Sequence, residues 1–201
     1  MTMILSSLDR IRRLVRTGDV FAYGADRGLG EWIEAFTDSD QSHTSFAVVQ
    51  GDLLQVTEAT IRGAKTRPVA KNWEKAADMW WLPIGRRLRF DGDALMAYLQ
   101  DICQRRVRYD FRALSPRVWR RGRPPEDFRR LYCSELVALG LKKAGVYEGT
   151  AELTPAEVCR LAVYEGSYHC IKWGEDGPKK IDDYNTVTPY GDPLGATVPA
   201  F

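Results

Sequence analysis

The chain has 201 residues, of which 44% are hydrophobic and 28% are charged, and its 29 basic and 27 acidic residues leave a net charge of +2. This size predicts a single globular domain over residues 1–201, and the near balance of charge excludes a protein that binds nucleic acid through its overall charge. Because the sequence contains neither a secretory signal nor a run of about 20 apolar residues, it predicts a cytoplasmic protein.

The first half of the chain is predicted to hold a helix followed by strands. Leu8, Ile11 and Val15 lie at helical spacing among four arginines, which is typical of a helix that packs one stripe on a core or lies on a membrane surface. The residues that follow predict a strand over 20–23, a helix over 29–36, and a hairpin of strands 44–50 and 53–60 about the two-residue turn Gly51-Asp52.

The second half is predicted to hold most of the helices. The pattern indicates a strand over 79–83, a helix over 93–105, an irregular stretch over 107–130, a core-facing helix that ends at Gly145, a helix start at Thr154-Pro155, a strand over 167–173 and an extended tail over 174–201. Strands that come first and helices that follow favour an α+β fold, with a small, mostly antiparallel sheet packed on helices.

The cysteines and histidines limit the chemistry that the chain can carry. The four cysteines form no C-x-x-C pair, and neither of the two histidines completes a spacing typical of zinc ligands. We therefore expect free thiols in a reducing compartment, and no metal or cofactor. The cysteines are Cys103, Cys133, Cys159 and Cys170.

Cys133 is the candidate nucleophile. It lies in Tyr132-Cys133-Ser134, directly before an apolar helix pattern, so it is predicted at a helix N-terminus, where unpaired amides and the dipole favour the thiolate. The thiolate is the reactive form of cysteine, and the backbone N–H of Cys133 is placed to help hold an oxyanion. The alternative is a buried structural cysteine, since free cysteine is among the most buried residues.

His43 and Glu58 are the candidate partners of this thiol. A cysteine–histidine pair must use His43, which precedes a strand after a polar loop, or His169, which lies in an ordinary strand context. If the residues that flank Gly51-Asp52 oppose each other, His43 and Glu58 become diagonal neighbours on one sheet face, roughly 7–8 Å apart. A carboxylate there can orient the imidazole as in a triad, whereas a register slip of one residue would separate them.

Five short motifs follow one another along the chain. They are Thr17-Gly18-Asp19-Val20-Phe21, Ser42-His43-Thr44, Thr57-Glu58-Ala59, Tyr109-Asp110 and Tyr132-Cys133-Ser134-Glu135-Leu136-Val137. This ordered set resembles the circularly permuted NlpC-like branch of the papain-like superfamily, of YiiX-like type, in which the histidine precedes the cysteine. The resemblance covers roughly residues 18–163.

This resemblance implies a papain-like fold in circularly permuted order and a role for each candidate residue. Cys133 would be the nucleophile, His43 its base and Glu58 the residue that orients the imidazole, although the third position varies in chemical type across the superfamily. Members of the superfamily include cell-wall peptidases and amidases, and the permuted relatives include enzymes like lecithin:retinol acyltransferase.

The stretch over 105–130 has no counterpart in the family pattern. It holds ten arginines against three acidic residues, with Phe111 and Trp119 among them. One interpretation is a solvated surface loop; the others are contact with an anionic lipid surface, an anionic substrate or nucleic-acid phosphate. The resemblance favours lipid or acylated substrates over nucleic acid.

Together these observations predict a cysteine hydrolase or acyltransferase that acts on an amide or ester bond through an acyl-thioenzyme. The expected substrate is a cell-wall peptide or a lipid or other acylated molecule, with peripheral membrane contact as a further expectation. The alternative is a module on the same fold that binds lipid or peptide without turnover. An arginine-rich nucleic-acid binder is the weaker third interpretation, since one cluster is its sole support.

Overall fold

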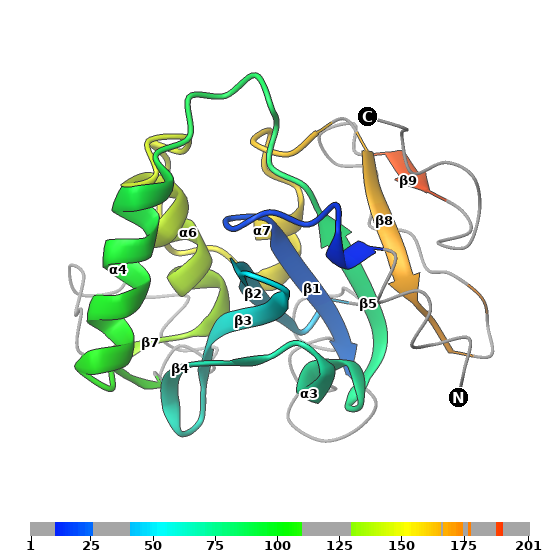
Figure 1. Cartoon of the computed structure of the whole chain (residues 1–201), viewed down its shortest axis with the longest axis horizontal. Coiled ribbons are helices and arrows are strands. Elements are labelled where there is room, and N and C mark those ends of the chain that lie inside the picture. Colours follow the sequence, from blue (N-terminus) through cyan, green and yellow to red (C-terminus); the bar gives the residue numbers. More distant parts are fainter. Residues whose placement is uncertain are drawn as a thin grey trace.

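The largest element of the computed structural model is a seven-stranded sheet in the order β4-β3-β2-β1-β5-β8-β9 (Figure 1). The structure describes residues 11–25, 41–109, 130–165, 167–174, 177 and 188–190. Neighbouring strands are antiparallel, except that β8 and β9 are parallel. The strands are β1 (Val20–Ala25), β2 (His43–Gln50), β3 (Leu53–Thr60), β4 (Gly63–Pro68), β5 (Ala76–Leu82), β8 (Ser167–Lys172) and β9 (Thr188–Tyr190).

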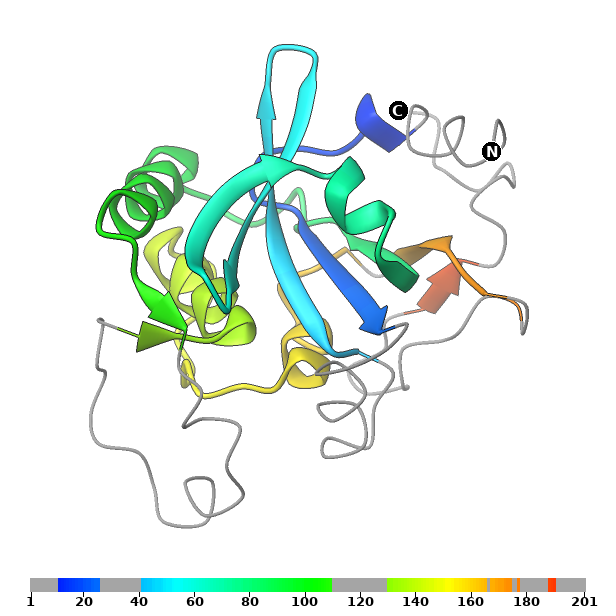
Figure 2. The same ribbon diagram turned by 90° about the horizontal axis from the view of Figure 1, so that it is seen from below.

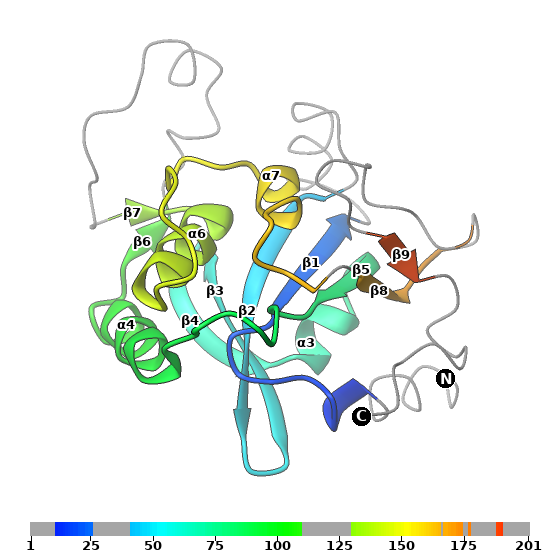
Figure 3. The same ribbon diagram turned by 90° about the horizontal axis from the view of Figure 1, so that it is seen from above.

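Helices cover both faces of this sheet unequally. Three helices, α4, α6 and α7, lie on one face (Figures 1 and 3), while the short α3 lies on the other. A separate two-stranded parallel pair, β6 and β7, lies beside α6. These elements are α3 (Ala70–Trp73), α4 (Gly92–Gln104), β6 (Arg108–Tyr109), β7 (Arg130–Leu131), α6 (Cys133–Lys143) and α7 (Pro155–Cys159).

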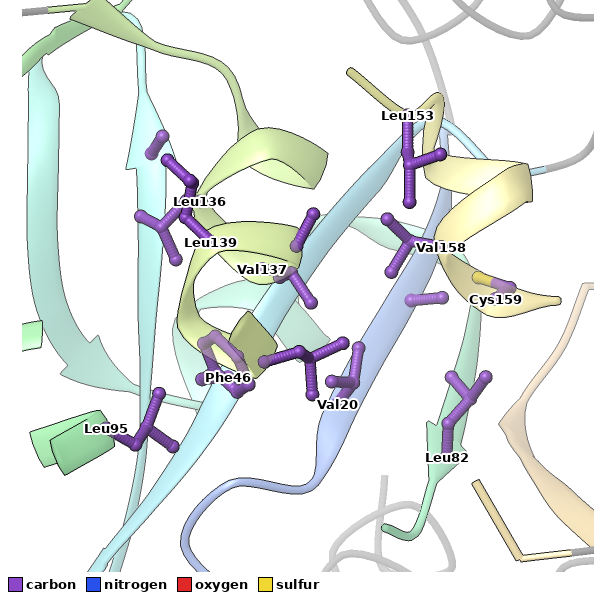
Figure 4. Close-up of a cluster of buried hydrophobic side chains, with 14 of the residues drawn as sticks. Val20, Phe46, Leu82, Leu95, Leu136, Val137, Leu139, Leu153, Val158 and Cys159 are labelled. Atoms are coloured by element: carbon purple, nitrogen blue, oxygen red, sulfur yellow. The ribbon is translucent and has the colours of Figure 1, made fainter. Parts of the chain in front are cut away.

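The alternation of side chains along the strands builds two apolar cores. On β1, Val20 and Ala22 face the helices while Phe21 and Tyr23 face the other side, as the two-residue period of a strand requires. The larger core joins the strands to α4, α6 and α7 (Figure 4). There Phe46 packs against Gly140 so closely that a Cβ at this glycine would lie 2.3 Å from the ring. The sheet and α6 are therefore held in one relative position.

The motif Gly18-Asp19 fixes the start of β1. Gly18 has a φ of +100°, and the Phe90 ring lies where its Cβ would be, so both the backbone and the packing require glycine. The Asp19 carboxylate accepts hydrogen bonds from the Arg16 N–H, the Trp81 indole N–H and the Ile84 N–H at 2.9–3.0 Å. This buried carboxylate thereby ties the N-terminal segment to β5.

The predicted strands over 20–23, 44–50, 53–60, 79–83 and 167–173 correspond to β1, β2, β3, β5 and β8. The predicted helices over 93–105 and after Cys133 correspond to α4 and α6. Gly145 follows α6 with a φ of +73°, and Thr154 caps α7 through a capping box with Glu157. The fold class is therefore α+β with a mostly antiparallel sheet.

The expectation of a small sheet needs correction. The sheet is larger than expected, because the sequence analysis missed β4 and β9, whereas the late strand β8 was expected. β4 reads Gly-Ala-Lys-Thr-Arg-Pro, which lacks the apolar alternation of a strand. β9 spans three residues within the segment 174–201, most of which lies outside the described residues, as do the predicted helix over 29–36 and most of 107–130.

The helices that the structure describes are too short or too polar for any of them to cross a lipid bilayer.

Candidate active site

The first turn of α6 places Cys133 at the end of a buried helix. Tyr132 is the N-cap residue, with an extended backbone, and Cys133 is the first helical residue. Ser134 donates a hydrogen bond from its hydroxyl to the Leu153 carbonyl at 2.5 Å, which fastens this helix end to the segment before α7. The sequence prediction of a cysteine at a helix N-terminus is confirmed. The residue is buried, with 2% of its surface exposed.

His43 is the first residue of β2 and lies at the edge of the protein interior. Its side chain is 27% exposed, so one side of the ring remains open to solvent. The ring packs against Tyr23, with 5.5 Å between the two centroids and 39° between the planes. Tyr23 is itself fixed, because its hydroxyl lies 2.7 Å from the Ser45 hydroxyl. These contacts hold the imidazole between β1 and β2.

Glu58 lies beside this imidazole, as the hairpin register predicted. The β2–β3 ladder pairs Gln50 with Leu53 and Phe46 with Thr57, and the Nε2 atom of His43 lies 2.6 Å from Oε2 of Glu58. The Glu58 side chain has no exposed surface. A strand register without a slip therefore brings the two residues together on one face.

Two further residues bind the Glu58 carboxylate. The Asn72 side chain donates a hydrogen bond to Oε2 at 3.0 Å. Arg67, on β4, places Nε 2.5 Å from Oε1, an ion pair that is close but not aligned as a hydrogen bond. A buried carboxylate requires such partners to remain charged. Glu58 is thus held between the imidazole and the guanidinium.

The charges of Cys133 and His43 favour each other. Burial alone would lower the pKa of His43, but the thiolate of Cys133, which is hydrogen-bonded to the ring, and the Glu58 carboxylate raise this pKa to about 10. For Cys133, burial opposes ionisation, yet the charge and hydrogen bond of His43 lower the pKa of the thiol. The backbone N–H groups of Thr44 and Ser134 also donate to the sulfur. Each group therefore favours the charged form of the other, the thiolate of Cys133 and the imidazolium of His43.

Glu58 stays ionised over the whole physiological range. Burial would raise its pKa, but His43, Arg67 and Asn72 lower it to about 2. The same negative charge, after the larger effect of burial, raises the pKa of the neighbouring Tyr23 hydroxyl. The phenol therefore stays neutral beside the ion pair.

The structure brings together Cys133, His43 and Glu58, the three residues that the sequence singled out. His169 lies elsewhere: it stacks on Trp81 with 4.7 Å between centroids, and burial lowers its pKa to about 4. Burial raises the pKa of the thiols of Cys103 and Cys159, in contrast to Cys133. Of the motif Tyr109-Asp110, Tyr109 belongs to β6 and Asp110 lies outside the described residues.

Sequence reasoning missed Arg67, Asn72 and Tyr23. Arg67 lies on the unpredicted strand β4, and Asn72 lies on α3, whose four residues are too few to show a helical period. The available signal was the turn Ile61-Arg62-Gly63 after β3, which predicts a second hairpin and hence a strand beside Glu58.

The arrangement has the elements that nucleophilic chemistry requires. The imidazole lies in series between a thiolate and a carboxylate, each of which it contacts. Within the described ranges, no group of three or more histidine, cysteine, aspartate and glutamate side chains is placed to hold a metal ion. A thiolate with a cationic neighbour at a helix N-terminus is instead an activated nucleophile.

Comparisons with known proteins give a structural likeness. No family model matches the sequence, and no curated protein matches it. Among solved structures, the crystal structure of the metalloprotein YiiX from Escherichia coli O157:H7 matches with a TM-score of 0.51 and 22% identity. The match covers 64% of this chain and 66% of that one. The chain therefore has a YiiX-like fold over about two thirds of its length.

Proposed function

We propose that this protein is a papain-like cysteine hydrolase or acyltransferase that acts on an amide or ester bond. One observation carries the proposal: the Cys133 sulfur, at the first turn of α6, is hydrogen-bonded to His43, whose Nε2 lies 2.6 Å from the buried carboxylate of Glu58. Nucleophile, base and orienting carboxylate in this sequence of contacts are the elements of a catalytic triad.

The reaction follows from the charges of these groups. The Cys133 thiolate attacks the substrate carbonyl and forms a carbon–sulfur bond, and the carbonyl oxygen takes up the electron pair. The N–H of Cys133, which belongs to the first turn of α6 and so has no partner within the helix, is the donor offered to this oxyanion. The imidazolium of His43 then protonates the leaving amine or alcohol, which gives an acyl-thioenzyme.

The neutral imidazole formed in this step completes the cycle. It takes a proton from water, or from an acceptor alcohol or amine, whose oxygen or nitrogen attacks the thioester. The thiolate leaves, and the imidazolium is restored. Glu58 stabilises the imidazolium through its charge and holds the ring orientation.

The sequence resemblance supports the same proposal. The histidine precedes the cysteine in the chain, as in the circularly permuted NlpC-like branch, and the likeness to YiiX agrees with the YiiX-like type of that resemblance. The permuted papain-like family, the reaction and the acylated substrate remain parts of one proposal, which rests on the site.

Thiol selectivity tests the proposal. In the native protein at pH 6, brief treatment with iodoacetamide is expected to label Cys133 at least about tenfold faster than Cys103, Cys159 or Cys170, because a thiolate is the attacking species. Peptide mapping by mass spectrometry measures the four rates. Equal labelling of all four thiols, or labelling of another thiol alone, contradicts the proposal.

Two histidine variants identify the base. His43→Ala is expected to slow the labelling of Cys133 about tenfold or more, because the thiolate loses its cationic partner. His169→Ala is the matched control, since its imidazole is buried against Trp81 and should leave the rate within about twofold. Circular dichroism checks that both variants are folded. If His169→Ala slows the labelling of Cys133 and His43→Ala does not, the assignment of His43 as the base is wrong.

A further inference from the structure

Four basic side chains gather at the end of the sheet where the catalytic residues lie. We call them the cationic rim: Arg62, in the turn between β3 and β4; Lys65, on β4; and Arg106 and Arg108, beside and on β6. Arg62, Arg106 and Arg108 are exposed and Lys65 is half-buried.

Backbone contacts join the two halves of the rim. The Ala64 N–H donates to the Val107 carbonyl at 3.0 Å. Gly63 lies so close to the same segment that its Cβ would meet the Val107 oxygen at 3.0 Å and the Arg106 oxygen at 3.5 Å. Arg62 precedes Gly63, and Arg106 precedes Val107, so the backbone segments that carry the two halves of the rim are in direct contact.

The rim lies beside the nucleophile and its partners. Lys65 directly opposes Glu58 in the β3–β4 ladder, so its side chain shares the sheet face of the triad carboxylate. On the other side, Arg108 pairs with Arg130 in the parallel β6–β7 ladder, and β7 is separated from Cys133 by Tyr132 alone. Figure 2 shows β6 and β7 side by side next to the start of α6.

Among the described residues, no carboxylate neutralises the charges of the rim. Neighbouring cations have carboxylate partners: Arg67 pairs with Glu58, and Arg105 lies 2.7 Å from Asp101. None of the four rim residues forms an ion pair with another described residue. Burial, together with the like charges of Arg67, Arg62 and Lys75, lowers the pKa of Lys65, although Glu58 partly opposes this effect. An anion placed here would relieve that repulsion.

We propose that the cationic rim binds a phosphate or carboxylate group of the substrate whose carbonyl Cys133 attacks. This inference rests on the proposed function and narrows its substrate class to anionic acyl compounds. The β6–β7 ladder places the rim next to the segment that leads into Cys133, and its charges, which no described carboxylate pairs, supply the attraction for that group.

Two alkylating reagents that differ in charge test the rim. Iodoacetate is an anion and iodoacetamide is neutral, and the ratio of their rates at Cys133 reports the local potential. One unit charge about 10 Å away in water changes a rate by about twofold. Arg62→Gln with Lys65→Gln is therefore expected to lower the iodoacetate-to-iodoacetamide ratio about fourfold at low ionic strength. For the wild type, moderate salt should lower the ratio in the same direction.

The control removes two charges at the far end of α6. Lys142→Gln with Lys143→Gln changes the net charge equally but lies in the last turn of the helix whose first turn holds Cys133. At a separation of about 15 Å these two charges should change the ratio by at most about 2.5-fold, less than the effect of the rim charges. A ratio that the rim substitutions leave unchanged, or that both pairs lower equally, overturns the inference. A Cys133 that iodoacetamide fails to label overturns the proposed function instead.

Competition then identifies the source of the anion. Inorganic phosphate that lowers the iodoacetate rate of the wild type but not of the rim variant indicates a soluble anionic substrate. Phosphatidylglycerol vesicles that do so, where phosphatidylcholine vesicles do not, indicate a lipid headgroup. If neither competitor acts, the rim does not bind anions and the inference fails.

Discussion

At the scale of single residues, the unusual feature is a buried carboxylate shared by two cations. Glu58 meets the imidazole through Oε2 and the guanidinium of Arg67 through Oε1. Arg67 thus stabilises the charged form of Glu58. Its own positive charge also offsets part of the stabilisation that Glu58 gives to the His43 imidazolium. Removing one partner of such a group leaves the other buried without compensation, so the effects of the two residues should depend on each other.

A double-mutant cycle between Glu58 and Arg67 measures this dependence. Glu58→Gln is expected to slow the alkylation of Cys133 at pH 6 about tenfold. The positive charge of Arg67 then destabilises the His43 imidazolium, because no carboxylate remains there to offset it. Adding Arg67→Met should recover several-fold of that rate, since the repelling charge is gone. Contacting charges usually couple by about 0.5–3 kcal/mol.

Arg67→Met alone gives the pH signature. Without the guanidinium, the pKa of Glu58 should rise from about 2, so the acid limb of the alkylation profile should move to higher pH. Unfolding curves of all four proteins separate this effect from a loss of stability. Strictly additive rates, with an unchanged acid limb, would show that Arg67 has only a structural role.

At the scale of elements, α6 is the part that positions the nucleophile, and Gly140 sets how closely it approaches the sheet. The helix buries its residues from Cys133 to Leu141. At Gly140 a Cβ would lie 2.3 Å from one atom of the Phe46 ring and 2.7 Å from another. A larger side chain must move either the ring or the helix.

Gly140→Ala is therefore expected to destabilise the protein, although alanine favours helices by about 1 kcal/mol over glycine. Overpacking in a close-packed core costs about 1–3 kcal/mol, which exceeds that gain. Gly92→Ala in α4 is the matched control, because its Cβ would meet Phe90 at an ordinary 3.8 Å. Urea unfolding measures both free energies. A Gly140→Ala protein at least as stable as the wild type would contradict the packing argument.

The sequence predicted the elements whose signal is local. Gly51-Asp52 set the hairpin register, and with it the contact between His43 and Glu58, because a two-residue turn leaves one pairing for the strands. The apolar pattern after Cys133 predicted α6 in the same way. Arg67 and Asn72 escaped prediction, because their elements are short and polar and are held by tertiary contacts. The contact between His43 on β2 and the Cys133 sulfur on α6 joins two layers of the fold, and its prediction depended on the family resemblance.

At the scale of the whole molecule, Asp19 is a buried carboxyl group that joins distant parts of the chain. Burial raises its pKa to about 6, although the N–H groups of Arg16, Ile84 and Trp81 favour the charged form. The folded protein therefore binds this proton more tightly than the unfolded chain does. By linkage, the free energy of unfolding should fall as the pH rises from about 4 to about 6 through this group.

Comparison with Asp19→Asn isolates that contribution. The difference in the free energy of unfolding between wild type and variant should decrease by about 2 kcal/mol from pH 4 to pH 7, since one pKa unit corresponds to about 1.4 kcal/mol and the unfolded carboxyl is already partly ionised at pH 4. Urea titrations at four pH values measure it, and other titrating groups cancel between the two proteins. A difference that grows with pH would show that the three N–H donors outweigh burial.

The parallel pairing of β6 with β7 allows the length of the sequence between these two strands to vary. Arg108 lies opposite Arg130 and Tyr109 opposite Leu131, so the two residues that flank the segment 110–129 lie at neighbouring points. Parallel strands need a crossover of about a dozen residues or more, but nothing in the pairing sets an upper limit. The free energy of closing a connection grows only slowly with its length, so a longer sequence between β6 and β7 is expected to leave Cys133 in place. We therefore expect related chains to differ in the length and sequence of this segment while they keep the arrangement of Cys133, His43 and Glu58.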